Sequence, residues 1–358
     1  MPPRHSGAND AMRDALARVA PGTPLRDGID RVVRAKAGAL LVLSDDANVL
    51  SICSGGFLVD APYSPQRLSE LAKMDGAIII STDGGRIARA NVHLVPDPTV
   101  PTSETGTRHR TAERVARSLG VPVVSASEEM GVINVYAGGS KRLLQEVGHL
   151  LDRANQALQT LERYKVRLDD AILSLTSAEL EDAVSLRDVA TVLQRGEMVL
   201  RIAEEIETMI VELGIEARLL RLQLDETYGD IEDELDLVID DYVPVGRKAS
   251  ATLAEMAALS DDDVLDLRTA AAALHRAADP KDLDQEVAPK GLRLLNRVHR
   301  LSDDSASRIV EHFGGLARLQ RATVPDLMEV DGVDDATAAS IKETLQRVTE
   351  TAILDQYS

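Results

Sequence analysis

The chain has 358 residues, more than one domain usually contains, so two or three domains are expected. Hydrophobic residues make up 44% and charged residues 28%, a balance that excludes an intrinsically disordered chain. With no Trp and two Phe, the chain is poorly suited to stacking single-stranded nucleic acid. One cysteine excludes an internal disulfide, and no apolar run approaches the roughly 20 residues of a membrane span. The expected compartment is the cytoplasm, without membrane association.

The formal net charge of −19 is distributed unevenly. Residues 225–242 contain nine carboxylates and no Lys or Arg, whereas residues 290–321 contain seven Lys or Arg and three carboxylates. Such asymmetry predicts different partners for different parts of the chain. The acidic run is most simply a solvated face, with metal binding as the alternative.

Residues 10–140 alternate between strand-like and helix-like patterns. Short β-rich runs bounded by Gly, Pro, Asn or Ser predict strands at 39–43, 77–81, 121–125 and 132–136. Helical spacing predicts helices at 65–73 and 111–119. Strands interleaved with helices indicate an α/β domain, with a mixed sheet covered by helices.

A first candidate motif, Asp75-Gly76-Ala77, lies at the start of a predicted strand. A carboxylate there can hold a divalent metal or accept a proton from a hydroxyl. The glycine beside it lets a ligand approach the backbone. The alternative is an ordinary Asp-Gly turn.

A second candidate motif runs from Gly106 to Glu113, with Arg108, His109 and Arg110 at a predicted helix start. Thr107 or Arg108 is expected to cap this helix, whose first turn exposes backbone N–H groups. Cations at that end are repelled by the helix dipole by about 0.3–1 kcal/mol each, so the arrangement is favourable only with an anion among them. A triphosphate fits, because Arg offers bidentate forks and Thr offers hydroxyls. The alternative is a surface basic cluster paired with acids such as Glu104.

Other phosphate-binding signatures are missing from the sequence. Neither motif matches a Walker loop, a kinase loop or the dinucleotide fingerprint. Ser127 follows a predicted strand and could help to hold metal or phosphate, with a simple helix cap as the alternative.

A helical pattern begins near residue 141. From 144 to 175, apolar residues recur at spacings of three and four in a heptad-like stripe that is broken only at Lys165. A second helical pattern covers 178–241 and is ended by Pro244 and Gly246. Together these patterns predict an all-α spine over 141–287, packed against another helix or another subunit.

Beyond Pro289, helices are expected at 290–301, 302–313, 316–322, 324–330 and 334–349, which makes residues 288–358 an all-α domain. Ser302 and Thr323 are expected to be N-caps, and Gly314-Gly315 a helix stop. Residues 330–341 are similar to the helix-hairpin-helix motif, which meets DNA phosphates through backbone N–H groups. Asp334 stands where that motif usually has a second glycine.

A degenerate second hairpin within 301–319 is expected to complete a DNA-binding surface. The predicted contacts are Gly332, Arg297, Arg300, Arg308 and Arg318. A small protein-interaction domain is the alternative.

The paired motifs, Asp75-Gly76-Ala77 and Gly106 to Glu113, together resemble those of diadenylate cyclase domains, as does the segment 91–104. This resemblance implies a nucleotidyltransferase that condenses two ATP into cyclic di-AMP and releases two diphosphates, with Mg²⁺ or Mn²⁺ as cofactor. Asp75 would be the catalytic and metal-binding residue. The ATP-binding residues would be Gly76, Ala77, Leu94, Thr107, Arg108, His109, Arg110, Thr111 and Ser127.

A cyclase domain, a helical spine and a helix-hairpin-helix domain, in this order, resemble the DNA integrity scanning family of diadenylate cyclases. The resemblance covers essentially the whole chain and implies a bacterial homo-octamer that binds branched or damaged DNA and makes a second messenger. Two other interpretations stay open at this point. One is a DNA architectural protein without activity, and the other is a sensor that binds ATP without turning it over.

Overall fold

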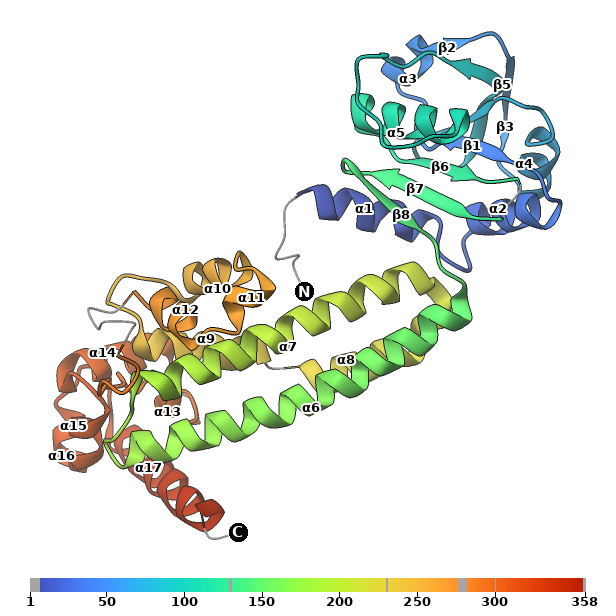
Figure 1. The fold of residues 1–358 in the computed structure, drawn as a ribbon. Coiled ribbons are helices and arrows are strands. Elements are labelled where there is room, and N and C mark those ends of the chain that lie inside the picture. The colour runs from blue at the N-terminus through green and yellow to red at the C-terminus, as the bar shows by residue number, and fades with distance from the viewer. Residues whose placement is uncertain (1–6, 129–130, 230, 276–281, 300, 357–358) are drawn as a thin grey trace. The chain divides into compact units, whose positions relative to one another are not determined.

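The computed structural model describes residues 7–128, 131–229, 231–275, 282–299 and 301–356. The chain forms two compact units, the first made of Met1–Ala157 and Glu205–Gln223, the second of Leu158–Glu204 and Leu224–Ser358. Two long helices, α6 (Val147–Leu180) and α7 (Leu186–Leu213), contribute residues to both units (Figure 1). Among the described helices, none is long and apolar enough to cross a membrane.

The first unit is built on a sheet of eight strands. They are β1 (Ala39–Val42), β2 (Cys53–Ser54), β3 (Phe57–Pro62), β4 (Ala77–Ile80), β5 (Arg86–Leu94), β6 (Val123–Ala126), β7 (Ile133–Ala137) and β8 (Ser140–Leu143). Their order is β2-β5-β4-β1-β6-β7-β8, and β3 pairs with β5. Among these strands, β1 and β4 pair in parallel and the other pairs are antiparallel, so the sheet is mixed.

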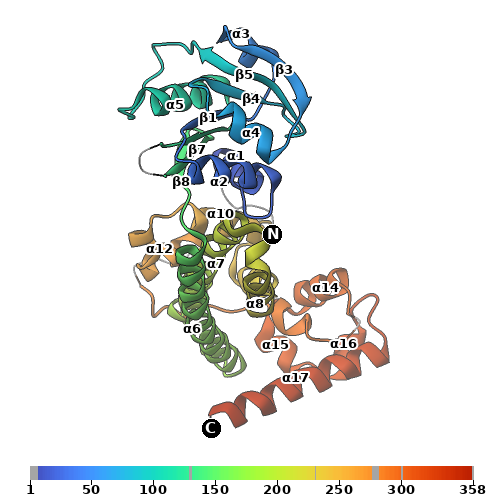
Figure 2. The ribbon, with the colours of Figure 1, turned by 90° about the vertical axis from the view of Figure 1, so that its right-hand side faces the viewer.

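Helices cover both faces of this sheet (Figures 1 and 2). One face packs against α1 (Gly7–Arg18), α2 (Pro24–Arg34) and α4 (Pro65–Leu71), and the other against α3 (Ala47–Ser51) and α5 (Thr107–Leu119). Neighbouring strand residues belong to opposite cores, as Leu41 and Leu40 do. Strands buried on both faces read as continuous apolar runs, which is why β1, β4, β6 and β7 were predictable. The α/β domain with a mixed, helix-covered sheet is confirmed.

Four strands, β2, β3, β5 and β8, were missed by the sequence prediction. In β5 the alternation is broken, because its pairing with β4 shifts register twice and Asn91 has a left-handed φ of 51°. The side chains of the edge strand β8 are mostly exposed, so its sequence shows no apolar pattern. The helical spacing read at 111–119 belongs to a helix that begins at Thr107, within the second motif where a helix start was expected.

The heptad-like stripe is buried along α6. Its buried members are Ala154, Leu158, Leu161, Leu168, Ile172 and Leu175. Lys165, which breaks the stripe, extends to Asp169 at 3.1 Å. The second helical pattern is several helices rather than one: α7, a 3₁₀ turn (Gly214–Ala217), α8 (Arg218–Tyr228) and α9 (Ile231–Tyr242). Gly214, with φ of 55°, separates α7 from the rest.

The second unit continues through α10 (Ala249–Ala257), α11 (Asp261–Val264) and α12 (Leu267–Ala273). It ends with α13 (Leu292–Leu295), α14 (Asp303–Phe313), α15 (Leu316–Arg321), α16 (Val324–Met328) and α17 (Asp335–Gln356), which share a core of their own. Ser302 and Thr323 are N-caps and Gly314 ends α14, as predicted. The helix expected at 290–301 is shorter than predicted: it begins after Gly291, which has a left-handed φ of 102°, and it ends at Leu295.

Candidate active site

The two motifs meet at a cavity of about 340 Å³ in the first unit. Asp75, Gly76 and Ala77 reach it from the start of β4, and α5 reaches it through its first turns. The lining residues are Leu40, Asp75, Gly76, Ala77, Val92, His93, Leu94, Thr107, Arg108 and Thr111. Seven of them were sequence candidates. Leu40 was missed because the apolar run of β1 signals only a core, and Val92 and His93 were missed because β5 itself was missed.

An ion pair joins the motifs across this cavity. The Arg108 Nη2 donates to Asp75 Oδ1 at 3.0 Å, over 33 residues of sequence. The side chain of Asp75 is 96% exposed, so its carboxylate is open to a ligand from outside the chain. The expected alternative pairing with Glu104 does not occur for Arg108. Glu104 instead pairs with Lys141 at 2.6 Å and accepts from the Tyr136 hydroxyl.

Two glycines make room for this arrangement. A Cβ on Gly76 would lie 2.5 Å from the Cα of Asn91, so β4 approaches β5 this closely only without a side chain there. A Cβ on Gly38 would overlap the guanidinium of Arg108. Gly38 was not a sequence candidate, because its role depends on a contact 70 residues along the chain.

The first turn of α5 faces the cavity without a side-chain cap. Gly106 is the N-cap residue and makes no side-chain bond, which corrects the expectation that Thr107 or Arg108 caps the helix. There is no acidic residue in this first turn, so α5 itself does not compensate the positive end of its dipole. The Thr111 hydroxyl donates to the Thr107 carbonyl at 3.0 Å, and Arg110 is exposed. The site therefore presents positive charge beside one exposed carboxylate.

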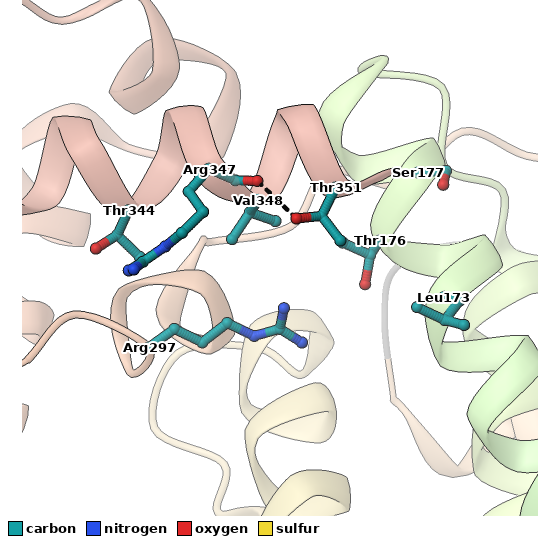
Figure 3. Close-up of a pocket in the computed structure, with 8 residues that line it drawn as sticks. All are labelled: Leu173, Thr176, Ser177, Arg297, Thr344, Arg347, Val348 and Thr351. Atoms are coloured by element: carbon teal, nitrogen blue, oxygen red, sulfur yellow. Dashed lines mark hydrogen bonds between the residues drawn. The ribbon is translucent and has the colours of Figure 1, made fainter. Parts of the chain in front are cut away.

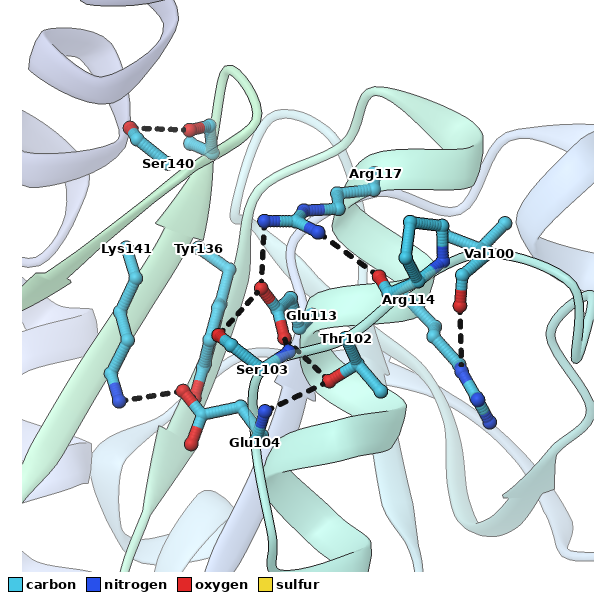
Figure 4. A network of polar contacts seen from close by, with 12 residues as sticks. Val100, Thr102, Ser103, Glu104, Glu113, Arg114, Arg117, Tyr136, Ser140 and Lys141 are labelled. Carbon is cyan, nitrogen blue, oxygen red and sulfur yellow. Dashed lines mark hydrogen bonds and ion pairs between the residues drawn. The ribbon is translucent and has the colours of Figure 1, made fainter.

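A buried network fixes the segment that leads into α5 (Figure 4). Glu113 is 5% exposed and accepts from the Ser103 backbone N–H at 2.9 Å and from the Thr102 hydroxyl. Arg117 pairs with the same carboxylate at 2.9 Å. Burial opposes ionisation, but these hydrogen bonds and Arg117 outweigh it and lower the pKa of Glu113. Sequence reasoning missed this role, since Glu113 stands within the second motif among residues that suggest phosphate binding.

We expect Glu113→Gln to destabilise the first unit by about 1–3 kcal/mol at pH 7, because a buried charged acceptor is lost. A carboxyl whose pKa is lowered by folding stabilises above its unfolded pKa, here 4.5, and loses that contribution as the pH falls through its folded pKa. The difference between variant and wild type should therefore shrink below pH 4.5. Urea unfolding at a series of pH values measures it. A pH-independent difference would contradict this account.

Three predicted site residues lie outside the cavity lining: His109, Arg110 and Ser127. His109 is half-buried, and this burial is the main reason that its pKa is lowered; the nearby Glu104 only partly opposes the shift. Ser127 follows β6, is half-buried, and donates its backbone N–H to Val132 at 2.9 Å.

The cavity offers few ligands for a divalent metal. No group of three or more His, Cys, Asp or Glu side chains gathers among the described residues, so an ion at this cavity would have one protein carboxylate, Asp75. Mg²⁺ is usually bound by one or two carboxylates, substrate phosphates and water rather than by an all-protein cage. The residues present fit an ion that arrives with a phosphorylated substrate.

The predicted DNA contacts lie in the second unit. Gly332, with φ of 85°, is in the turn between α16 and α17, and a Cβ there would lie 3.0 Å from the Arg308 guanidinium. Asp334 accepts the Thr337 N–H at 2.8 Å and so caps α17. Hydrogen bonds from the Thr337 side chain and backbone N–H lower the pKa of Asp334, so an aspartate suits this position. Arg318 is exposed near Gly314. Arg297 lines a separate pocket, and Arg300 lies outside the described residues.

Comparisons with known proteins identify the family. The DisA bacterial checkpoint controller nucleotide-binding family matches residues 26–141, and the DisA bacterial checkpoint controller linker region matches residues 144–281. The DNA integrity scanning protein DisA of Streptomyces coelicolor is 50% identical, over 98% of this chain and 96% of that protein. Those of Streptomyces avermitilis and Parafrankia sp. are each 49% identical, over 98% of this chain and 96% and 98% of theirs. The chain therefore belongs to the DisA family and is a diadenylate cyclase.

Proposed function

We propose that two copies of the first unit face each other, each with ATP in its cavity, and that the C-terminal hairpins bind DNA. The observation that best supports this proposal is the contact between Arg108 and Asp75 across a cavity lined by both motifs. A cyclic dinucleotide needs two nucleotides, whereas each chain offers one such cavity with an exposed carboxylate at its edge. The proposed assembly is the homo-octamer that the family resemblance implies.

In this proposal the phosphates bind at the start of α5. The guanidinium of Arg108 supplies a fork for phosphate oxygens, and the hydroxyls of Thr107 and Thr111 lie in the same lining. The uncapped first turn adds backbone N–H groups and the helix dipole. His109, Arg110 and Ser127 are proposed to join the phosphate contacts in the assembled site. Gly76, Ala77 and Leu94 border the adenosine.

The reaction then consists of two reciprocal phosphoryl-group attacks between the facing nucleotides. The 3′-oxygen of each ATP attacks the α-phosphorus of the other, forming a phosphodiester bond and breaking the bond to the departing diphosphate. A phosphate that occupies Arg108 competes with its bond to Asp75, leaving that carboxylate to accept the hydroxyl proton of the facing ribose. We propose that Asp75 also holds Mg²⁺ or Mn²⁺, which would neutralise charge on the phosphoryl oxygens.

Product analysis tests the proposal. The purified chain incubated with ATP and Mg²⁺ or Mn²⁺ should yield one cyclic di-AMP for every two diphosphates, as measured by mass spectrometry and a diphosphate assay. Bound but unconverted ATP would favour the sensor interpretation instead. A chain that neither binds nor converts ATP would point to the architectural one.

Gly38→Ala offers a remote test of Arg108. The added Cβ meets the flexible end of the Arg108 side chain rather than backbone, so the fold should survive while the guanidinium moves. We expect ATP affinity, measured by calorimetry, to fall by about tenfold or more, since a charge-assisted hydrogen bond is worth about 1.5–3 kcal/mol. Gly148→Ala, where a Cβ meets nothing within 4 Å, is the matched control. Equal affinities for the two variants would show that the position of Arg108 is immaterial.

DNA binding by the C-terminal hairpins is a second proposed function. A left-handed glycine in the α16–α17 turn, with the Arg308 guanidinium beside it, suits a phosphate contact to backbone N–H groups. The DisA relatives are named for DNA integrity scanning, which agrees with this reading. Branched or damaged DNA is the proposed target.

A further inference from the structure

A second pocket, of about 280 Å³, lies in the second unit between α6, α17 and the segment after α13 (Figure 3). It shares no residue with the cavity of the cyclase site. Its lining residues are Leu173, Thr176, Ser177, Arg297, Thr344, Arg347, Val348 and Thr351. None of them is acidic, in a chain whose net charge is −19.

Two guanidiniums in this pocket have no hydrogen-bond or ion-pair partner among the described residues. Neither the Arg297 nor the Arg347 side chain makes a hydrogen bond or ion pair with a residue that the structure describes. Arg201, by contrast, bonds Glu197 and Asp261. Figure 3 shows the Arg297 guanidinium turned toward Thr176 of α6. Like charges in one hollow repel each other, so an anion between them would make the arrangement favourable.

A third arginine lies behind the pocket wall. Arg293 is 2% exposed and donates to the hydroxyl of Thr176, which lines the pocket, at 3.0 Å. Its Nε and Nη1 atoms have no hydrogen-bond partner among the described residues. Glu179, which pairs with Arg293, also accepts from the Tyr242 hydroxyl at 2.7 Å. The carboxylate behind this wall is thus engaged by Arg293 and Tyr242, and it attracts Arg297, as Glu234 does, without pairing with it.

We propose that this pocket binds the phosphate group of a small phosphorylated ligand. Arginine forks match phosphate oxygens in a bidentate way, and the hydroxyls of Ser177 and Thr344 add donors. Leu173 and Val348 provide an apolar wall for an uncharged part of the ligand. The volume lies near the lower end of small-molecule pockets, roughly 300–1,000 Å³, which suits a ligand no larger than a mononucleotide. Such a ligand would connect α6 to α17.

Equilibrium dialysis of the full chain with radiolabelled phosphate, diphosphate and AMP tests this proposal. The Arg108→Ala background removes the guanidinium fork of the cyclase site and so weakens phosphate binding there. In that background we expect saturable binding of at least one probe. Adding Arg347→Gln or Arg297→Gln should weaken it at least about tenfold, through loss of a charge-assisted hydrogen bond. Arg321→Gln, an exposed arginine at the end of α15, is the matched control and should leave binding unchanged.

Hydrogen exchange gives an independent measurement. In the Arg108→Ala background, the bound probe should slow amide exchange in residues 173–177 and 344–351. Adding Arg347→Gln should remove this protection. Absence of saturable binding by all three probes would overturn the proposal, as would binding that is insensitive to both pocket substitutions. It would also be overturned if those substitutions weakened the binding of a DNA duplex and left the small probes unaffected, because the pocket would then hold a backbone phosphate of DNA.

Discussion

Asp75→Asn is expected to abolish cyclic di-AMP synthesis while leaving the fold and assembly intact. Asp75 is the carboxylate of the cavity lining, and asparagine can neither accept the hydroxyl proton nor hold a divalent ion as a carboxylate does. The stability should change little, because the side chain is 96% exposed and surface ion pairs contribute little. Product formation, circular dichroism and light scattering measure the three expectations.

The matched control for this prediction is Asp97→Asn. Asp97 is an exposed aspartate of the same unit whose carboxylate accepts from Thr99. This variant should retain synthesis. Normal cyclic di-AMP synthesis by a well-folded Asp75→Asn protein would show that Asp75 is not the catalytic residue.

DNA binding should be lost when residues 288–358 are removed. Truncation would also disturb the rest of the second unit, because the buried Asp241 carboxylate accepts the backbone N–H groups of Gly291 and Arg293. Point substitutions are the better test. We therefore expect the double variant Arg308→Gln, Arg318→Gln to reduce DNA affinity and flatten its salt dependence. Each phosphate contact contributes about −0.9 to the log–log slope, so the slope should change by about two units.

The same double variant should keep its basal cyclase activity, since both arginines lie in the second unit. Arg187→Gln, which changes an exposed arginine paired with Asp284, is the control and should leave DNA affinity unchanged. Filter binding at several salt concentrations gives the slopes. An unaltered slope in the double variant would place the DNA contacts elsewhere on the chain.

Local patterns were enough to predict much of this molecule. The α/β domain, the α6 stripe and the caps at Ser302 and Thr323 follow from burial on both strand faces, from heptad spacing and from capping chemistry. The bulged β5 was hidden because an interrupted alternation resembles a loop. The length of α13 was wrong because Gly291 and the buried carboxylate of Asp241 set its start, and that contact spans 50 residues.

The candidate site divides in the same way. Its charged residues could be read from the two motifs, because an arginine-rich helix start is unfavourable without an anion. Gly38, Val92 and the buried Glu113 network could not, since each acts through a distant contact: Gly38 through Arg108, Val92 through the sheet, and Glu113 through Thr102 and Ser103. Of the two pocket arginines, Arg297 was predicted as a DNA contact and Arg347 was passed over, because their enclosure with α6 is visible only in the fold.

The central claim is that Arg108 holds the phosphates and Asp75 performs the chemistry, and one paired measurement tests it most directly. ATP affinity by calorimetry and cyclic di-AMP formation at saturating ATP should be measured on Asp75→Asn and Arg108→Ala. We expect Asp75→Asn to bind ATP and form no product. We expect Arg108→Ala to bind ATP at least about tenfold more weakly, through loss of a charge-assisted hydrogen bond. Wild-type affinity in Arg108→Ala together with product from Asp75→Asn would contradict the account.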